Sequence, residues 1–337
     1  MIQAVKRSPL DLRPLLGITP AQDSATIAHA LSAYCRMPGL DGRERDDRIR
    51  WCLERLSELR SSSFDEPCWG YHFDVETRFF PYPRGTPNTI ATAFAGLALL
   101  DAHDLTESQE ALELAEGAGD FFIRHVGPVS VKSGRFFGYF PGDTTAIHNA
   151  NLLACGLLAR LAEPANRPDF AEAALEGMRF ALDHQREDGS WAYAEGEEGD
   201  WVDNLHTGYV LDSLQRCCVH LRDSEAAAAW RRGLTFFADR LFLENGAPRF
   251  SVNRTYPIDG QCAAQAIQTF AVASRVEPHW LSRAGRVLDY ALSHLRMADG
   301  SFIFQRGRVT VNRTPHPRWV QAPMLDALTR LWAVHAA

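Results

Sequence analysis

The chain has 337 residues, of which 46% are hydrophobic and 23% charged, and its formal net charge is -7. This composition is typical of a folded globular protein and excludes a disordered chain, and the acidic balance argues against a nucleic-acid partner. Residues 1–17 contain no unbroken apolar stretch of a signal peptide, and the longest apolar run, 90–100, is shorter than the roughly 18–20 residues of a membrane span. Seven cysteines, an odd number without CxxC spacing, indicate reduced thiols. We therefore expect a cytoplasmic protein with no transmembrane segment.

A repeat of roughly 55 residues organises the chain. The stretch 180–191, which ends in Asp-Gly-Ser-Trp, is echoed two periods later by 290–302, which ends in Asp-Gly-Ser-Phe. Weaker copies occupy 52–71, 121–139 and 236–250. Each copy predicts an amphipathic helix, a glycine-containing turn with an aromatic residue, and a second helix. Because the period runs through the sequence without a break, we expect one domain over 1–337.

The predicted helices alternate between two kinds along the chain. Helices that are apolar almost all round are expected to be buried on every side, whereas helices charged on one side are expected to form an outer layer. In chain order, starting with a buried helix and alternating thereafter, the helices are expected over 24–34, 44–60, 87–103, 107–125, 146–162, 168–185, 204–220, 223–242, 260–274, 278–296 and 319–335.

This alternation predicts an all-α fold, an (α/α)6 toroid of helical hairpins with short turn or β segments at one end. Small alanine and glycine residues would let the inner helices approach one another, and no polar capping repeat is evident. An open superhelical array is the alternative arrangement.

Polar side chains gather just before and within the first turn of each inner helix. In a toroid these helix starts face the same end, so the side chains are expected to meet at one mouth and to form a polar pocket. Candidate catalytic residues are His148, Asp203, His206, Tyr209 and Asp259. Candidate substrate-binding residues are Trp69, Tyr71, His72, Asp74, Asn88, Asn149, Asn151, Gln261, Gln265, Arg318, Trp319 and Gln321.

A second interpretation applies to four of these residues. Asn88, Asn149, Asp203 and Asp259 are good helix N-caps, which would satisfy backbone N–H groups without any part in catalysis. Capping does not account for the histidines, Gln265, Arg318 or Gln321.

Two local motifs resemble those of isoprenoid enzymes. The stretch from Phe180 through Gln185 to Trp191 resembles the QW motif of triterpene cyclases, where the glutamine and tryptophan tie an outer helix to its turn. The segments 205–214 and 259–262 are similar to the zinc-bearing segments of protein prenyltransferase β subunits. That resemblance implies an alternative in which His206, Asp259 and Cys262 bind zinc; otherwise no cofactor is expected.

A wider resemblance extends from about residue 69 to the C-terminus. The stretches 70–74, 86–91, 147–151, 203–209 and 256–259 are similar to a bacterial toroid family found with capsule and exopolysaccharide genes. The Arg-Trp-x-Gln-Ala segment at 318–322 is also similar to an element of unsaturated glucuronyl hydrolases, which are toroids of six hairpins.

These observations favour a carbohydrate-active enzyme of bacterial surface-polysaccharide metabolism, acting on a uronic-acid-containing glycan or its lipid-linked precursor by epimerisation, elimination or hydrolysis. The expected partner is a small-molecule or oligosaccharide substrate. Arg318 would bind the sugar carboxylate. His206 or His148 would be the general base, with Tyr209 or Asp203 as acid, whereas hydrolysis would use Asp203 and Asp259. The alternatives are an isoprenoid cyclase or prenyltransferase relative and a binding protein without catalysis. The oligomeric state stays open.

Overall fold

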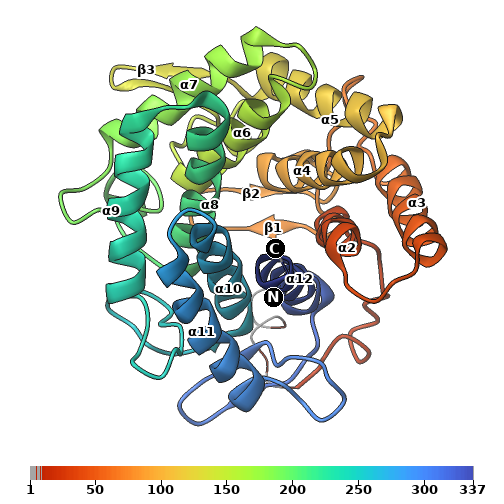
Figure 1. Cartoon of the computed structure of the whole chain (residues 1–337), viewed down its shortest axis with the longest axis vertical. Helices are drawn as coiled ribbons and strands as arrows, with labels where there is room; N and C mark the ends of the chain where they lie inside the picture. The colour runs from red at the N-terminus through yellow and green to blue at the C-terminus, as the bar shows by residue number, and fades with distance from the viewer. Residues whose placement is uncertain (1–4, 6–7, 9, 337) are drawn as a thin grey trace.

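The computed structural model describes residues 5, 8 and 10–336, and its helices form two concentric rings (Figure 1). The inner ring consists of alternate helices along the chain, each of which contacts the next, and α12 contacts α2. The inner helices are α2 (Ser24–Arg36), α4 (Thr89–Thr106), α6 (His148–Leu161), α8 (Asn204–Leu221), α10 (Gly260–Ser274) and α12 (Ala322–His335). The ring is therefore closed, which confirms the predicted (α/α)6 toroid and excludes the open array.

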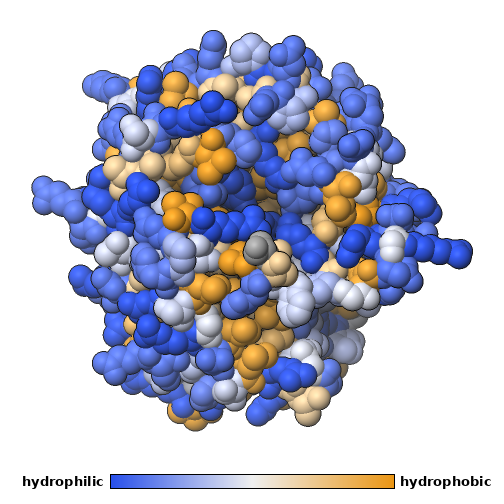
Figure 2. All heavy atoms as spheres, viewed as in Figure 1, coloured by the Kyte–Doolittle hydropathy of each residue, from blue (hydrophilic) through white to orange (hydrophobic). Residues whose placement is uncertain are grey.

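The outer helices lie against the inner ring and connect its members. Within the described residues they are α3 (Gly42–Glu58), α5 (Gln109–Phe121) with a π-helical turn (Phe122–Val126), α7 (Pro168–Asp183), α9 (Ser224–Arg240) and α11 (Leu281–His294), the last preceded by a 3-10 turn (Pro278–Trp280). Each predicted helix begins and ends within a few residues of these bounds. Hydrophilic side chains cover most of the rim of the face in Figure 2, and hydrophobic side chains lie nearer its middle.

Small residues set the spacing of the inner helices. A Cβ added to Gly96 of α4 would lie 2.5 Å from Cδ2 of Leu157 in α6, and one added to Gly208 of α8 would lie 2.5 Å from Cγ of Gln265 in α10. These contacts leave no room for a larger residue, because helices that approach this closely require glycine at the contact.

Repeated turns join outer helices to the segments that follow. The indole Nε1 of Trp191 donates to the carbonyl of Ala181 at 2.7 Å, and Nε1 of Trp69 donates to that of Leu56 at 2.8 Å. The amide of Gln185 donates to the carbonyl of Gly189 at 3.0 Å, in the manner that the QW resemblance implies. Gly189 and Gly300 both have φ of +90°, a backbone conformation that glycine adopts without strain.

Three small antiparallel sheets occur in the described part of the chain. The hairpin of β1 (Val75–Glu76) and β2 (Pro81–Tyr82) pairs Val75 with Tyr82 and crosses the middle of the ring in Figure 1. The remaining strands are β3 (Val129–Val131) with β4 (Gly134–Phe136), and β5 (Ile258–Asp259), β6 (Gln305–Arg306) and β7 (Val311–Asn312) in the order β5-β6-β7.

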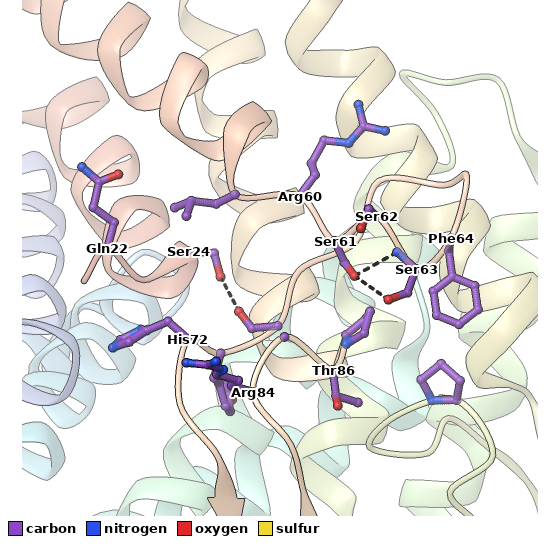
Figure 3. Close-up of a pocket in the computed structure, with 16 residues that line it drawn as sticks. Gln22, Ser24, Arg60, Ser61, Ser62, Ser63, Phe64, His72, Arg84 and Thr86 are labelled. Atoms are coloured by element: carbon purple, nitrogen blue, oxygen red, sulfur yellow. Dashed lines mark hydrogen bonds between the residues drawn. The ribbon is translucent and has the colours of Figure 1, made fainter. Parts of the chain in front are cut away.

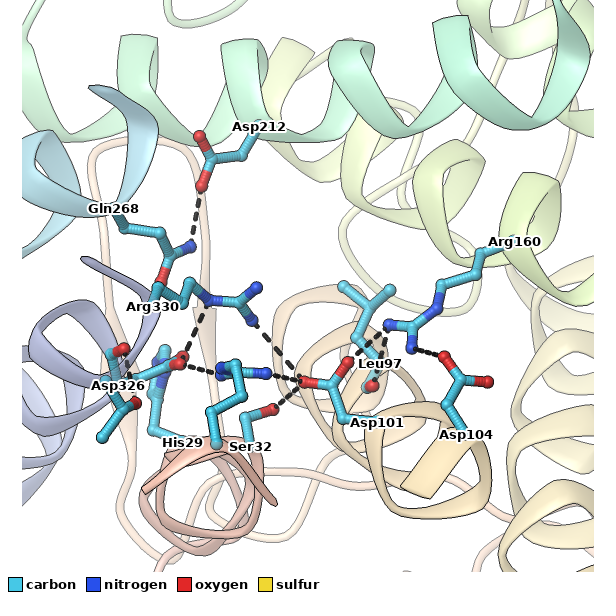
Figure 4. A network of polar contacts seen from close by, with 12 residues as sticks. His29, Ser32, Leu97, Asp101, Asp104, Arg160, Asp212, Gln268, Asp326 and Arg330 are labelled. Carbon is cyan, nitrogen blue, oxygen red and sulfur yellow. Dashed lines mark hydrogen bonds and ion pairs between the residues drawn. The ribbon is translucent and has the colours of Figure 1, made fainter. Parts of the chain in front are cut away.

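A buried ionic network joins the inner helices near their carboxyl ends (Figure 4). The carboxylate of Asp101 in α4 lies 2.7 Å from Arg36 of α2 and 2.8 Å from Arg160 of α6. Asp326 of α12 pairs with Arg36 and lies 3.0 Å from Nδ1 of His29, so ion pairs hold the first and last inner helices together. All seven cysteines are free thiols. No helix in the described residues is long and apolar enough to span a membrane.

Candidate functional site

A carboxylate and an imidazole are paired at the start of α8. Asp203 caps the helix: its Oδ1 accepts the backbone N–H of His206 at 2.9 Å. Its Oδ2 accepts from Nδ1 of His206 at 2.6 Å and from Nε1 of Trp201 at 3.1 Å. With Nδ1 bound in this way, the basic lone pair of His206 is on Nε2, which makes no hydrogen bond to any residue that the structure describes.

The Asp203 carboxylate is ionised in this arrangement. Burial raises the pKa of Asp203, but the charge and hydrogen bonds of His206 and Trp201 hold it below its usual value. The carboxylate therefore orients the imidazole through Nδ1. The side chain of His206 stays 33% exposed.

Aromatic rings surround this pair. Tyr193 and Trp201 are stacked with centroids 4.5 Å apart, and the ring of His206 meets Tyr193 edge-on at 4.6 Å. We call Tyr193 and Trp201 the platform. The outer face of a stacked aromatic pair next to a base is suited to hold a sugar ring.

The tip of the β1–β2 hairpin covers the platform. Phe79 stacks on Tyr193 at 5.8 Å and on Trp201 at 6.0 Å, and the guanidinium of Arg78 lies 4.9 Å from the ring centre of Trp201. The space left between Asn149, the platform and His206 is about 10 Å³, too small for a sugar. The hairpin must move before a ligand reaches the platform.

A buried arginine lies beside Tyr71 just before α12. The guanidinium of Arg318, whose side chain is 16% exposed, lies 3.8 Å from the ring centre of Tyr71. Its Nε is 3.7 Å from Oδ1 of Asp23, the residue that caps α2. The Nε and Nη1 of Arg318 are buried and have no hydrogen-bond partner in the described part of the chain.

Ionic contacts keep both of these groups charged. Burial raises the pKa of Asp23, but Arg318 and His72, whose Nδ1 is 3.4 Å from Asp23, lower it below the usual value. Burial lowers the pKa of Arg318, and Asp23 and nearby tyrosines raise it above the usual value. A charged guanidinium with unused donors is suited to bind a carboxylate.

Tyrosine hydroxyls face the same region. The hydroxyls of Tyr71 and Tyr139 are 3.5 Å apart, and Gln261 donates to the hydroxyl of Tyr209 at 3.0 Å. Burial raises the pKa of Tyr139 and of Tyr209 above the usual phenol value, so both remain neutral donors. The ring of Tyr209 lies 6.4 Å from that of His206. A series of side-chain contacts runs from Arg318 to His206 through Tyr71, Tyr139, Phe80, Phe79 and Tyr193. We refer to these residues and Tyr209 as the Arg318 cluster.

Several predicted site residues instead hold the framework together. Nε2 of His148 lies 2.7 Å from Glu195 and its ring faces Phe180, so its imidazole is directed at Glu195 and not at Arg318 or His206. The other members of this group bond to backbone or to buried side chains. Trp69 binds Leu56, Asn151 binds Phe137 and Gly177, Gln265 binds Asp212 and Thr269, and Gln321 binds Phe302.

The capping interpretation holds for three of its four residues. Asn88 accepts from the N–H of Ala91, Asp203 caps α8, and Asp259 accepts from the N–H of Gln261 at 2.8 Å. Asn149 is not a cap, because α6 begins before it.

Two candidates remain. Asp74 is exposed and accepts the N–H of Arg84. Trp319 lies in a π-helical turn (Pro317–Gln321) and packs against Phe73 and His316.

The zinc alternative does not fit this geometry. Nδ1 of His206 is bound to Asp203, Asp259 accepts from Gln305 at 2.7 Å, and burial raises the pKa of the Cys262 thiol. Among the described residues, no group of three or more His, Cys, Asp or Glu side chains is arranged to hold a metal ion.

Asp23, which contacts Arg318, and Tyr82, whose ring lies 6.5 Å from that of Tyr71 and 6.2 Å from that of Tyr139, were not singled out from the sequence. Asp23 directly precedes the first inner helix, as Asn88 and Asp203 precede theirs, so the repeat itself contains the signal for it. Tyr82 lies in β2, in a segment with no helical pattern to place it.

No protein-family model and no curated protein matches this sequence. Among solved structures, the chain is similar to a cellobiose 2-epimerase from Spirochaeta thermophila, with TM-score 0.70 and 16% identity over 94% of this chain and 86% of that one. It is also similar to a GH76 α-mannanase from Bacteroides thetaiotaomicron, with TM-score 0.73 and 14% identity over 95% and 88%. An unsaturated glucuronyl hydrolase specific for heparin matches with TM-score 0.64 and 13% identity over 93% and 87%. These toroids of sugar-processing enzymes share the fold of this chain.

Proposed function

We propose that the protein is an enzyme that processes a saccharide carrying a uronic acid, and that the mouth between Arg318 and His206 is its active site. One observation carries the proposal. A charged arginine, whose Nε and Nη1 are buried without a hydrogen-bond partner in the described residues, is connected through aromatic side chains to a histidine that Asp203 orients. Buried polar groups without partners are costly, and a ligand that supplies the missing acceptors offsets that cost.

The residues support a reaction that begins with proton removal. Arg318 would bind the sugar carboxylate and stabilise negative charge that develops on the carbon next to it. His206 would take the proton from that carbon through Nε2, while Asp203 stabilises the imidazolium. The neutral hydroxyl of Tyr209 would donate the proton to the other side in epimerisation, or to the leaving oxygen in elimination.

Hydrolysis by a carboxylate pair fits this geometry less well. Both oxygens of Asp203 already accept hydrogen bonds, from the backbone and side chain of His206 and from Trp201. Asp259 is bound to the start of α10 and to Gln305. Neither carboxylate is free to act as nucleophile or general acid, so epimerisation or elimination is the reaction class that we propose.

The names of the similar structures support a saccharide substrate: one refers to a sugar epimerase, one to a mannanase and one to a hydrolase of unsaturated glucuronyl groups. The choice of epimerisation or elimination rests on the geometry of Asp203, His206 and Asp259 alone. We further propose, from the sequence resemblance described above, that the substrate belongs to bacterial surface-polysaccharide metabolism.

Solvent isotope exchange tests the proposal. Wild-type protein is incubated in deuterated buffer with oligosaccharides ending in glucuronate or galacturonate, and NMR measures deuterium at the carbon next to the carboxylate, while ultraviolet absorbance detects an unsaturated product. His206→Asn is expected to abolish exchange, and Arg318→Gln to weaken substrate binding by roughly 10- to 100-fold. His220→Asn, an exposed histidine at the far end of α8, is the matched control. Exchange that is absent throughout, with substrate binding unaffected by Arg318→Gln, would contradict the proposal.

A further inference from the structure

A groove of about 850 Å³ opens beside the mouth (Figure 3). It is lined by the connection between α3 and α4, in the stretches 59–64, 70–72 and 84–87, together with Gln22 and Ser24 at the start of α2. Its volume is in the range of sites that bind ligands of several rings. Unlike the platform, it is open in this structure.

The lining of the groove is cationic and rich in donors. Its titratable side chains are Arg60, His72 and Arg84, together with the phenol of Tyr71, and no Asp or Glu lines it, although the whole chain has a net charge of -7. Neither Arg60 nor Arg84 makes a side-chain ion pair with any residue that the structure describes. The concentration of unpaired positive charge on an acidic protein indicates that the groove attracts anions.

Neutral groups of the groove match the surface of a sugar. Serine hydroxyls at 61–63 and the amide of Gln22 are hydrogen-bonding partners for sugar hydroxyls, and Figure 3 shows Ser61, Ser63 and Phe64 along one side. Phe64 and Tyr71 contribute aromatic surface. Hydrogen-bonding groups with aromatic faces are a lining suited to carbohydrate more than to an apolar chain.

The groove lies next to the mouth. Tyr71 lines the groove and also lies under the guanidinium of Arg318, and His72 lines the groove and contacts Asp23. The β1–β2 hairpin leaves the groove between His72 and Arg84, as Figure 3 shows, and its tip covers the platform. Movement of this hairpin, which access to the platform already requires, would bring the end of a chain bound in the groove towards Arg318.

We infer that this groove binds the further sugars of an anionic oligosaccharide whose terminal uronate enters the mouth. The inference rests on the proposed function and specifies its substrate class, an oligouronate held at its end. Carboxylates on successive sugars would pair with Arg60 and Arg84, and the serines would bind ring hydroxyls. An enzyme built in this way acts on a chain end and prefers longer chains to monosaccharides.

Calorimetric titration with oligouronates of two lengths tests the inference. For each uronate, the readout is the association constant of the tetramer divided by that of the monomer; the two pairs are tetragalacturonate with galacturonate and tetramannuronate with mannuronate. Each ratio is measured in wild type and in the double variant Arg60→Gln/Arg84→Gln. We expect a ratio of about ten or more in wild type for at least one uronate, and a fall of about five- to tenfold in the double variant. Arg43→Gln/Arg179→Gln removes the same charge from exposed arginines outside the groove and should leave the ratio unchanged.

The outcomes separate the two proposals. If Arg318→Gln weakens both lengths while the groove variant lowers only the ratio, both proposals stand. If binding of the tetramer depends on Arg60 and Arg84 but not on Arg318, the groove stands and the proposed function fails. If tetramers bind no better than monomers or not at all, or if the Arg43/Arg179 control lowers the ratio equally, the groove inference is overturned. Equal competition by a tetranucleotide would also overturn it, since any anion would then suffice.

Discussion

Asp203 has two tasks at the start of α8, because a carboxylate has two oxygens. One oxygen caps the helix, and the other holds Nδ1 of His206 three residues later. The sequence pattern led to capping and catalysis as competing interpretations of such residues, and the structure shows that they are compatible. An aspartate N-cap followed by a histidine at the third position of the helix can accept a free backbone N–H with one oxygen and orient the imidazole with the other.

The two histidines of the predicted site point in different directions for a geometric reason. His148 is the first residue of α6, whereas His206 is the third residue of α8, so the repeat aligns His148 with Asn204 and not with His206. Two residues along a helix correspond to a rotation of about 200°. His148 accordingly contacts Glu195, and Asn204 likewise bonds to the backbone of Leu241. The sequence places a helix start to within a few residues, and that margin is enough to reverse the direction of a side chain.

Replacement of Asp203 by asparagine tests its charge without removing the cap. We expect Asp203→Asn to lower the free energy of unfolding by about 1–2 kcal/mol at pH 7, because the bond to His206 loses its charge. Since the folded-state pKa of Asp203 is depressed, its contribution is fully present above the unfolded pKa near 3.9 and is lost as pH falls through the folded pKa.

Urea denaturation measured from pH 7 down to pH 3 should therefore show the gap between wild type and Asp203→Asn closing at the acid end. Asp74→Asn, at an exposed carboxylate that also accepts a backbone N–H, should change stability little. A gap that is absent at pH 7, or that stays unchanged down to pH 3, would mean that the charge of Asp203 does not stabilise the fold.

Trp191 is the residue on which the packing of its repeat depends most directly. It is 3% exposed, its indole donates to Ala181, and a Cβ on Gly233 of α9 would lie 2.5 Å from its ring. Trp191→Ala should lower the free energy of unfolding by about 3–5 kcal/mol, since the cavity lies between two hairpins. Chemical denaturation measures it, with Trp332→Ala, at a 54% exposed tryptophan, as the control that stays near wild type. A loss of less than about 1 kcal/mol for Trp191→Ala would show that the indole is not needed between the hairpins.

At the scale of elements, the helices follow from the sequence and the β1–β2 hairpin does not. Helices repeat a pattern of apolar residues over three or more turns, which makes their positions readable. The paired strands of the hairpin span only two residues each, and its aromatic side chains Phe79, Phe80 and Tyr82 find their partners in distant turns such as 139–140 and 193–201. Such contacts depend on the closed ring, so the covering of the platform could be seen only in the structure.

The hairpin tip competes with the proposed ligand for the platform. Phe79→Ala removes the ring that stacks on Tyr193 and Trp201, and the covered state is then less favoured. An aromatic pair contributes about 0.5–1.5 kcal/mol, so the affinity for a uronate ligand should rise by roughly two- to tenfold.

Calorimetric titration of wild type and Phe79→Ala with the same oligouronate measures this change. Val309→Ala, at a 94% exposed residue of another loop, is the control. Weaker binding by Phe79→Ala would instead show that the tip forms part of the binding surface when the ligand is present.

At the scale of the whole molecule, the two ends of the inner ring have different tasks. The helix starts supply the site, whereas the thirteenth residues of α2, α4, α6 and α8 are all charged: Arg36, Asp101, Arg160 and Arg216. Burial lowers the pKa of Arg216 to about 10. The positive charges of the arginines at this end interact favourably with the negative ends of the helix dipoles. Their recurrence at one position can be read from the sequence once the helices are known, but their pairing across the ring cannot.

Asp326 joins the last inner helix to the first and should therefore control the stability of the closed ring. It is 3% exposed and bonds to Arg36, Arg330 and His29, and these partners hold its pKa below the usual value although burial raises it. Asp326→Asn removes one of the two carboxylates that balance Arg36 and Arg330 and leaves only Asp101, which should lower the free energy of unfolding by about 2–3 kcal/mol.

Urea denaturation followed by circular dichroism and by tryptophan fluorescence checks this effect. Asp104→Asn removes a carboxylate that also pairs with an arginine of the network but is 63% exposed, so it should cost at most about 1 kcal/mol. Because the ring is closed through α12 and α2, both probes should report one shared transition in Asp326→Asn, shifted to lower urea. Two separate transitions would mean that the halves of the ring unfold independently, and an effect as small as that of Asp104→Asn would mean that helix packing alone closes the ring.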